Sequence, residues 1–550
     1  MNTLLFLAVA CSTKTEVDTE DTNSATPVDS GQETGAPIDP RFEELQAILE
    51  GELEDLNAVG VSIAIMEDGE ISFAKAFGSK SATEQVSPDT ETLFQLGSVT
   101  KMLTSIGLLQ QVQNQGLNIN GPIAEHYPDS EFAADESWND GLTIANLLSH
   151  RSGMYDWLGM PGSAADGYLK TWFESVFFPN LWLMNPSGLF YNYSNPNFSL
   201  AGLLMEQLDA AGRTYPDIMQ EEVFTSLGMN RSYLRKSDAK ADGNFSESVG
   251  YIVAEDGSSS FGPVTMAKWD DMAQGRPAGS GTWSTPTQMM EVARFILDSN
   301  EDILDEELRS QMLEKQVSIN NSYYKIGMAY GYGIVSMDGL VLEDAYYPET
   351  ILQHDGATTS FSATFWVLPE KNAAFCILSN GYGSSFGSSI VAALELLMEG
   401  DNDASSDLPV RSINMDDLDF HDAAYKDEYN FGTIELRRVN NTLTISMPQL
   451  DELGYTYDSN LTMAGEGLFY LLLEDVYYDL RMEGPANGPT EYVVNRAFVG
   501  TRNPIQEAFA PTTTPQSSLT DSERRLRIDR ILREGASPIS PLALGLPQPR

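Results

Sequence analysis

A serine and a lysine three residues apart, at the start of a helical pattern, could together carry out catalysis. Ser98 and Lys101 open a stretch of helical periodicity that ends near Gly116. Residues three apart on a helix are neighbours on one face, so the Lys101 amine can reach the Ser98 hydroxyl. A serine hydroxyl becomes a good nucleophile when a base takes its proton, and a lysine whose pKa is lowered by burial or positive neighbours is such a base. The pair predicts serine acyl transfer, with N–H groups at the helix start free to bind an oxyanion.

The same spacing occurs at three other places, and their surroundings differ. Ser72 to Lys75 lies in an alternating strand pattern, and Ser237 to Lys240 lies in a polar stretch without periodicity. Ser322 to Lys325 reads as a loop or the start of a strand. An isolated match also fits a helix cap beside a solvated lysine, so the interpretation of Ser98 depends on its partners.

Tyr193-Ser194-Asn195 is the only Tyr-x-Asn sequence among 23 tyrosines. A phenol held near a lysine can pass a proton between a serine and a leaving group. The asparagine amide can hold both the lysine and the carbonyl of a substrate. The alternative is a plain turn, because Asn192, Pro196 and Asn197 all favour turns.

His354 is the only one of four histidines in a His-x-Gly pattern directly before a strand-like segment. Gly356 would let the backbone approach a ligand closely, and the N–H of Ala357 could complete an oxyanion hole with that of Ser98. The alternative is a hairpin with a surface histidine.

In this order the three motifs resemble the serine β-lactamase and penicillin-binding-protein superfamily, particularly its class C β-lactamase, D-aminopeptidase and esterase branch. That branch has Ser-x-x-Lys, then Tyr-x-Asn, then Lys-Thr-Gly or His-x-Gly. The resemblance covers roughly residues 40 to 400. The other stretches that carry it are Phe94–Ser98, Leu147–Met154, Tyr193–Phe198 and Ala278–Thr285.

The resemblance implies a role for each motif residue. Ser98 would be the nucleophile, Lys101 the base for acylation, and Tyr193 the shuttle that protonates the leaving group and activates water. The N–H groups of Ser98 and Ala357 would bind the oxyanion. His150 is also at a family-like position, and we interpret it as structural, holding a loop. Substrate binding would fall to Asn195, His354, Gly356 and Ala357.

His354 stands where true β-lactamases carry a lysine. A fixed cation that pairs with the carboxylate of a β-lactam or D-Ala terminus is thereby replaced by a group expected to titrate near neutrality. This favours peptidase or esterase activity over efficient β-lactam hydrolysis.

Other catalytic signatures are missing from the sequence, which has no His-Glu-x-x-His, Cys-x-x-Cys or phosphate-binding glycine-rich loop followed by Lys-Ser or Lys-Thr. Four scattered histidines and two cysteines do not readily supply a zinc site. We expect no metal and no cofactor. A net charge of −48 argues against nucleic acid as a partner.

The amino-terminal residues predict an anchor and a tether. Residues 1–11 resemble a bacterial lipoprotein signal with lipid attached at Cys11, and an ordinary secretory signal is the alternative. Residues 12–40 are acidic and poor in large apolar side chains, so they predict a disordered tether. We expect a lipid-anchored protein of the bacterial cell envelope, facing the periplasm or the outer membrane.

The rest of the chain predicts an α+β domain followed by a smaller all-β domain. Residues 41–400 begin and end with strands and carry helices between them, which implies an antiparallel sheet flanked by helices, with a helical subdomain. The resemblance implies the same fold. Residues 409–510 show short alternating segments typical of a sandwich or small barrel, and many relatives carry a lipocalin-like module there. Residues 511–550 form a Pro/Arg-rich tail that either docks as a short helix or stays loose.

We therefore expect an envelope serine hydrolase acting on a small-molecule or peptidoglycan-derived amide or ester. One rival is a catalytically silent relative that binds peptidoglycan or another ligand. A second rival is that the all-β domain defines the function as a lipid or peptide binder.

Overall fold

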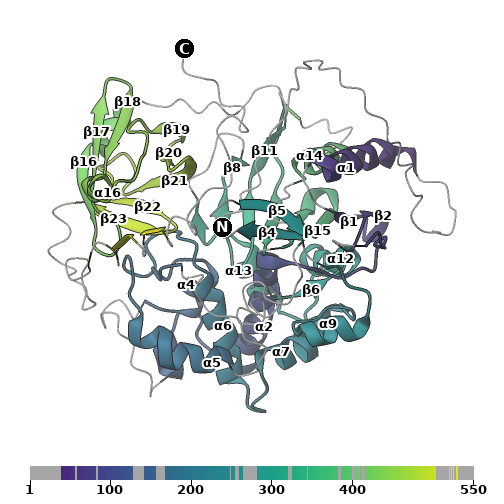
Figure 1. The fold of residues 1–550 in the computed structure, drawn as a ribbon. Coiled ribbons are helices and arrows are strands. Elements are labelled where there is room, and N and C mark those ends of the chain that lie inside the picture. Colours follow the sequence, from purple (N-terminus) through teal and green to yellow (C-terminus); the bar gives the residue numbers. More distant parts are fainter. Residues whose placement is uncertain are drawn as a thin grey trace, which may run out of the picture.

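An eight-stranded antiparallel sheet forms the centre of the molecule (Figure 1). The structure is a computed structural model, which describes residues 39–55, 59–81, 84–127, 141–156, 168–247, 249–253, 259–263, 281–319, 325–342, 345–358, 360–381, 386–398, 404–405, 409, 415–502, 520, 522, 524–525 and 528–529. The strand order is β2-β1-β15-β14-β13-β10-β9-β7. The strands are β1 (Gly60–Glu67), β2 (Glu70–Gly78), β7 (Val317–Ser318), β9 (Ala329–Tyr330), β10 (Val335–Met337), β13 (Ile351–Ala357), β14 (Ser362–Leu368) and β15 (Ala373–Ser379).

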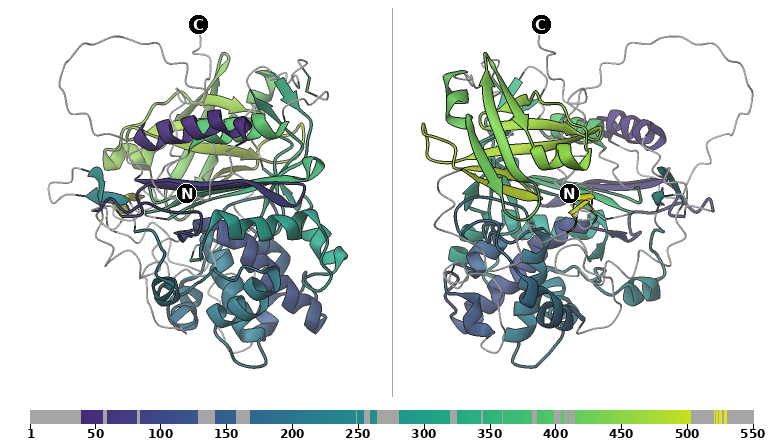
Figure 2. Two further views of the ribbon diagram at one scale, coloured as in Figure 1. Left: turned by 90° about the vertical axis from the view of Figure 1, so that its right-hand side faces the viewer. Right: turned by 60° about the vertical axis from the view of Figure 1, so that its left-hand side comes forward.

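Pairing of β1 with β15 joins the two ends of this domain, with Val61 opposite Ser379. In the left view of Figure 2, α1 (Glu43–Asp55) and α14 (Gly387–Met398) lie above the sheet, and α12 (Pro286–Leu297) lies below it with the helical part. Because both faces are covered, every residue of β14 and β15 is buried. The two faces carry separate apolar clusters.

The helical part is built around α2 (Thr100–Gln115) and α6 (Asn195–Leu208), which pack against each other. The other helices and turns of the domain are η1 (Pro40–Phe42), η2 (Gly97–Val99), η3 (Ile123–His126), α4 (Ile144–Leu148), α5 (Tyr168–Trp172), η4 (Phe173–Phe177), η5 (Phe178–Asn180), α7 (Tyr215–Ile218), η6 (Met219–Phe224), α8 (Thr225–Leu227), α9 (Lys236–Asp242), α13 (Glu306–Leu313) and η7 (Pro369–Lys371). The minor strands are β3 (Phe94–Gln95), β4 (Val249–Val253), β5 (Ser259–Pro263), β6 (Trp283–Ser284), β8 (Lys325–Ile326), β11 (Gly339–Leu342) and β12 (Ala345–Tyr347).

A second eight-stranded antiparallel sheet forms the carboxy-terminal domain, in the order β18-β17-β16-β23-β22-β21-β20-β19. It curls until its edges meet, because the backbone at Ser459 and Leu461, just before β19, bonds to β18 at Ile445 and Leu443. Its elements are η8 (Met415–Asp417), α15 (Leu418–His421), β16 (Ala423–Asp427), β17 (Gly432–Val439), β18 (Thr442–Ser446), α16 (Pro448–Leu453), β19 (Thr462–Gly465), β20 (Leu468–Leu473), β21 (Val476–Glu483), β22 (Tyr492–Asn495) and β23 (Phe498–Arg502). The fold class expected from the sequence, an α+β domain followed by a smaller all-β domain, is confirmed.

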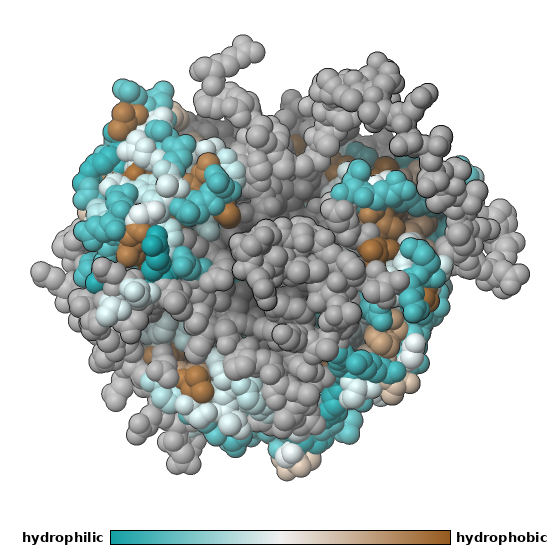
Figure 3. Space-filling view, viewed as in Figure 1, coloured by the Kyte–Doolittle hydropathy of each residue, from teal (hydrophilic) through white to brown (hydrophobic). Residues whose placement is uncertain are grey.

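Few large apolar side chains are exposed among the described residues. On the face shown in Figure 3, hydrophobic side chains form small separate patches among hydrophilic ones. The exposed large apolar side chains are far apart in the sequence: Ile71, Val86, Leu189 and Val439. Among the residues that the structure describes, no helix has the length and hydropathy needed to cross a membrane.

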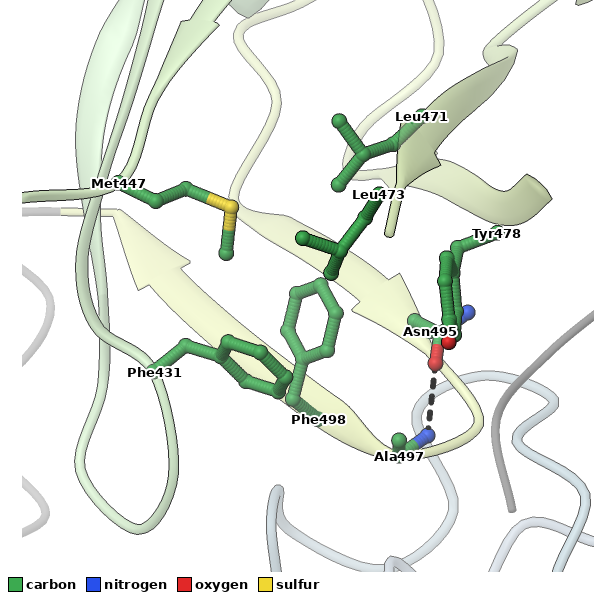
Figure 4. Close-up of a pocket in the computed structure, with 8 residues that line it drawn as sticks. All are labelled: Phe431, Met447, Leu471, Leu473, Tyr478, Asn495, Ala497 and Phe498. Atoms are coloured by element: carbon green, nitrogen blue, oxygen red, sulfur yellow. Dashed lines mark hydrogen bonds between the residues drawn. The ribbon is translucent and has the colours of Figure 1, made fainter. Parts of the chain in front are cut away.

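Side chains fill the interior of the carboxy-terminal sheet. A cavity of about 10 Å³ there is lined mainly by apolar side chains, including Phe431, Leu473 and Phe498 (Figure 4). That volume corresponds to about one water molecule. This cavity is too small for an organic ligand.

Two features of the fold differ from or go beyond the sequence-based expectation. His354, Gly356 and Ala357 lie inside β13 rather than before a strand, because this segment pairs with β14 over its whole length.

Part of the tail docks on the carboxy-terminal domain, where Ile528 is buried and the Arg525 guanidinium donates to the Leu453 carbonyl at 2.7 Å. Cys11 and residues 12–38 of the tether lie outside the described residues, so the anchor and the envelope location remain predictions.

Candidate active site

Ser98 lies in the tight turn η2 at the start of α2, pressed against strand β13. Gly97 has a left-handed φ of +52°, and a Cβ there would lie 2.5 Å from the Ala357 nitrogen. A Cβ on Gly356 would lie 1.9 Å from the Leu96 carbonyl oxygen and 3.1 Å from the Ser98 nitrogen. Only glycine at both positions allows this approach. It brings the backbones of Ser98 and Ala357, the two expected oxyanion donors, into one region.

Two of the expected side chains, those of Lys101 and Tyr193, meet at the Ser98 hydroxyl, and Asn195 joins them through Lys101. Lys101 Nζ donates to Ser98 Oγ at 3.0 Å, and the Tyr193 hydroxyl donates to the same oxygen at 2.9 Å. Lys101 Nζ also donates to Asn195 Oδ1 at 2.9 Å. Lys101 and Tyr193 are buried, whereas Ser98 is half-buried. Ser98 is thus less buried than the two proton carriers bonded to its oxygen.

Asn195 is the first residue of α6, and Tyr193 lies two residues before it. His150 supports this segment: it is buried, has a left-handed φ of 57°, and accepts the Ser194 N–H at Nδ1 over 3.1 Å. Its ring centroid lies 4.2 Å from that of Tyr193. Burial, followed by the charge of Lys101, lowers the pKa of His150 well below its usual value. A neutral ring in this place packs against the tyrosine and holds its loop.

Burial raises the pKa of Tyr193 well above its usual value, although the hydrogen bond with Ser98 opposes this effect. The phenol therefore keeps its proton at neutral pH. It can act as a donor to Ser98 or to a leaving group.

His354 does not titrate near neutrality, so that expectation is wrong. Its side chain is buried, with Nε2 2.9 Å from the Tyr330 hydroxyl and Nδ1 2.6 Å from the Asp355 carbonyl oxygen. Burial, followed by the charge of Lys101, lowers the pKa of His354 to about 3. The imidazole is neutral at physiological pH and supplies no cation for a substrate carboxylate.

Sequence reasoning missed Asp156, which braces Asn195. Asp156 Oδ1 accepts the Asn195 backbone N–H at 2.8 Å and its side-chain Nδ2 at 3.2 Å. Asp156 Oδ2 in turn pairs with Nε of Arg496, which lies 340 residues away in the carboxy-terminal domain. No local spacing links these residues, so the sequence carried no signal for them.

The remaining Ser-x-x-Lys matches have other surroundings. Lys75 Nζ donates to Gln46 on α1 at 2.9 Å, and Ser237 and Lys240 lie on the short helix α9. Ser322 lies outside the described residues. The structure describes residues 281–285 of the glycine-rich segment expected from the sequence. Its Thr282 carbonyl accepts the Leu96 N–H at 2.8 Å, two residues before the nucleophile. The described residues contain no group of three His, Cys, Asp or Glu side chains that could hold a metal.

This arrangement suits acyl transfer, since a serine oxygen, two proton carriers and backbone donors converge. The Beta-lactamase family model matches residues 45–397. The unguisins hydrolase ungD' of Aspergillus campestris is 30% identical over 221 residues, covering 38% of this chain and 39% of that protein. Protein flp of Staphylococcus aureus strain MRSA252 is 21% identical over 345 residues, 62% of each chain. The chain thus covers less than two thirds of the length of these relatives.

Solved structures share the fold. SurE with D-Leu superposes with a TM-score of 0.58 at 19% identity, over 84% of this chain and 99% of that one. The D-amino acid amidase from Ochrobactrum anthropi SV3, complexed with L-phenylalanine amide, superposes with a TM-score of 0.52 at 21% identity, over 64% of this chain and 99% of that one. The family model spans well over half of the chain, so the protein belongs to the beta-lactamase family.

Proposed function

We propose that this protein is a serine hydrolase that acts through a Ser98 acyl-enzyme on a small amide or ester. One observation carries the proposal: Ser98 Oγ accepts hydrogen bonds from both Lys101 Nζ and the Tyr193 hydroxyl. Acyl transfer needs one group to take the serine proton and one to protonate the leaving group. Membership of the beta-lactamase family supports the same chemistry.

In the proposed reaction, Ser98 Oγ attacks the substrate carbonyl carbon while Lys101 takes the hydroxyl proton. The N–H groups of Ser98 and Ala357 stabilise the charge that develops on the carbonyl oxygen. Tyr193 protonates the leaving amine or alcohol as its bond to the carbonyl carbon breaks. Water then attacks the acyl-enzyme as the deprotonated Tyr193 takes a proton from it. Lys101 returns its proton to Ser98 Oγ as the acid leaves, which restores all three side chains.

The proposed substrates are amides and esters, from a D-Ala-type peptide to a simple ester, rather than β-lactams. The neutral state of His354 supports this choice, because that side chain offers no positive charge to a β-lactam carboxylate. The unguisins hydrolase, at 30% identity, also supports a hydrolase.

The test is turnover of a short-chain nitrophenyl ester and covalent labelling by a fluorescent penicillin, for the full chain and for Ser98→Ala. We expect Ser98→Ala to abolish labelling and to lower kcat by about 10³-fold or more. Ser72→Ala is the matched control, since Ser72 precedes Lys75 at the same spacing, and it should behave as wild type. Absence of both labelling and turnover in the wild-type protein would instead favour a catalytically silent binding protein.

A further inference from the structure

Two arginines of the carboxy-terminal domain reach the loop that carries Tyr193. Arg481, on β21, donates to the Tyr191 carbonyl at 2.7 Å and to Asn192 Oδ1 at 3.0 Å, with its guanidinium 5.2 Å from the Tyr191 ring centroid. Arg496 pairs with Asp156 and lies 4.7 Å from the Tyr193 ring centroid. Both arginines are buried. One domain therefore holds the active-site loop of the other at two neighbouring points.

Arg496 projects from a braced two-residue turn between the paired residues Asn495 and Phe498. Asn495 Oδ1 accepts the Ala497 N–H at 2.9 Å, as Figure 4 shows, and Asn495 Nδ2 donates to the Asp479 carbonyl at 2.7 Å. Asn430 Nδ2 donates to the Ala497 carbonyl at 3.1 Å. These bonds fix the direction in which the turn presents its arginine.

The pair formed by Arg496 and Asp156 continues into the site through Asn195. Because both nitrogens of Asn195 donate to Asp156, the Asn195 side-chain oxygen is left facing Lys101. Lys101 in turn reaches Ser98. A buried carboxylate that lost its cationic partner would be left with an uncompensated charge, so it would move or take up a proton. Either change would alter the orientation of Asn195.

We propose that Arg496 is a positioning residue for catalysis, which makes the carboxy-terminal domain a working part of the active site. It holds Asp156, through which it orients Asn195 and Lys101, and its guanidinium packs on the ring of Tyr193. Arg481 secures the start of the same loop. The inference rests on the proposed hydrolase function, since it describes how that site is kept in its active geometry.

The test compares Arg496→Met, Arg496→Lys and Arg502→Met in the full chain. Arg502 is the matched control, because it lies on β23 of the same hairpin and donates to the Phe420 and Thr490 carbonyls within the carboxy-terminal domain. We expect Arg496→Met to lower kcat for the nitrophenyl ester by about 10- to 100-fold, as for a misplaced catalytic group, with KM changed far less. Arg496→Lys should recover part of the loss, and Arg502→Met should keep the wild-type kcat.

A double-mutant cycle with Asp156→Asn separates positioning from general damage. If Arg496 acts through Asp156, the loss in the double variant is smaller than the product of the two single losses. The proposal would be overturned if the losses in the double variant were multiplicative, or if Arg496→Met kept a kcat within twofold of wild type. It would also be overturned if Arg496→Met raised only KM, or if Arg502→Met lost as much kcat. Thermal unfolding of every variant shows whether the compared proteins are folded.

Hydrogen exchange of residues 191–195 distinguishes failure of this inference from failure of the proposed function. If the wild-type protein shows no labelling and no turnover, the hydrolase proposal fails by itself. Even then, faster exchange of this loop in Arg496→Met, but not in Arg502→Met, would support the inference that Arg496 keeps the loop in position. Equal exchange in wild type and Arg496→Met would overturn it.

Discussion

The Ser98 hydroxyl accepts two hydrogen bonds, and the one from Tyr193 can be removed with little change in packing. The Tyr193 ring packs against the Arg496 guanidinium and the His150 ring, which lie 4.7 Å and 4.2 Å from its centroid. Phenylalanine keeps these contacts and removes only the proton carrier. We therefore expect Tyr193→Phe to lower kcat by about 10²- to 10⁴-fold, the range for a general acid or base, with a near-normal melting temperature.

Steady-state turnover of the nitrophenyl ester and calorimetry check this expectation. Tyr191→Phe is the matched control, because Tyr191 is buried in the same loop two residues earlier. It should turn over near the wild-type rate. A Tyr193→Phe variant with wild-type kcat would show that another group moves the proton.

At the scale of elements, the contact between β13 and η2 sets the position of the nucleophile. Gly356→Ala would bring a methyl group to 1.9 Å from the Leu96 carbonyl oxygen, so the strand or the turn must shift. We expect the free energy of unfolding to fall by about 1–3 kcal/mol, the usual cost of overpacking. Activity should fall by about 10²-fold or more, because the backbone of Ser98 moves with the turn.

The control for Gly356→Ala is a glycine with open space around it. Gly51 lies on α1, and a Cβ at this position would point into open space. Gly51→Ala should leave activity unchanged and raise the free energy of unfolding by about 0.5–1 kcal/mol, because alanine favours helix. Urea unfolding measures both variants. Equal activity in Gly356→Ala and wild type would contradict the tight-contact argument.

At the scale of the whole molecule, buried histidines make stability depend on pH. Burial lowers the pKa of His354 to about 3 and that of His421 to about 4. In the unfolded chain a histidine takes up its proton near pH 6.5, so between about pH 3 and 6.5 the unfolded state binds more protons than the folded state. The free energy of unfolding should therefore rise with pH across this window and fall on acidification.

Urea unfolding between pH 4 and 7 tests this dependence. His421→Gln should flatten the pH dependence between about pH 4 and 6.5, because glutamine cannot titrate and can still reach Thr490, which now bonds His421 Nδ1 at 2.6 Å. An unchanged slope in His421→Gln would contradict the assignment of part of this dependence to His421.

Local sequence patterns were sufficient to predict the reacting groups of the site and the class of fold. Ser98 and Lys101 follow from helical spacing, because residues three apart share a face whatever the rest of the chain does. The alternating and helical segments indicated an α+β domain followed by an all-β domain, since periodicity reports which face of each element is buried. Tyr193 and Asn195 were recognisable because their motif is unique in the chain.

The long-range contacts of the site, in contrast, could be seen only in the folded protein. The tertiary structure joined Asp156 to Arg496 across 340 residues, and no local pattern encodes which turn of one domain docks on which loop of another. It also decided the charge of His354, because a pKa depends on desolvation by the whole surroundings and not on the neighbours in sequence. Spacing along the chain is enough to identify the reacting groups. The residues that hold those groups in place depend on sheet register and on how the two domains dock.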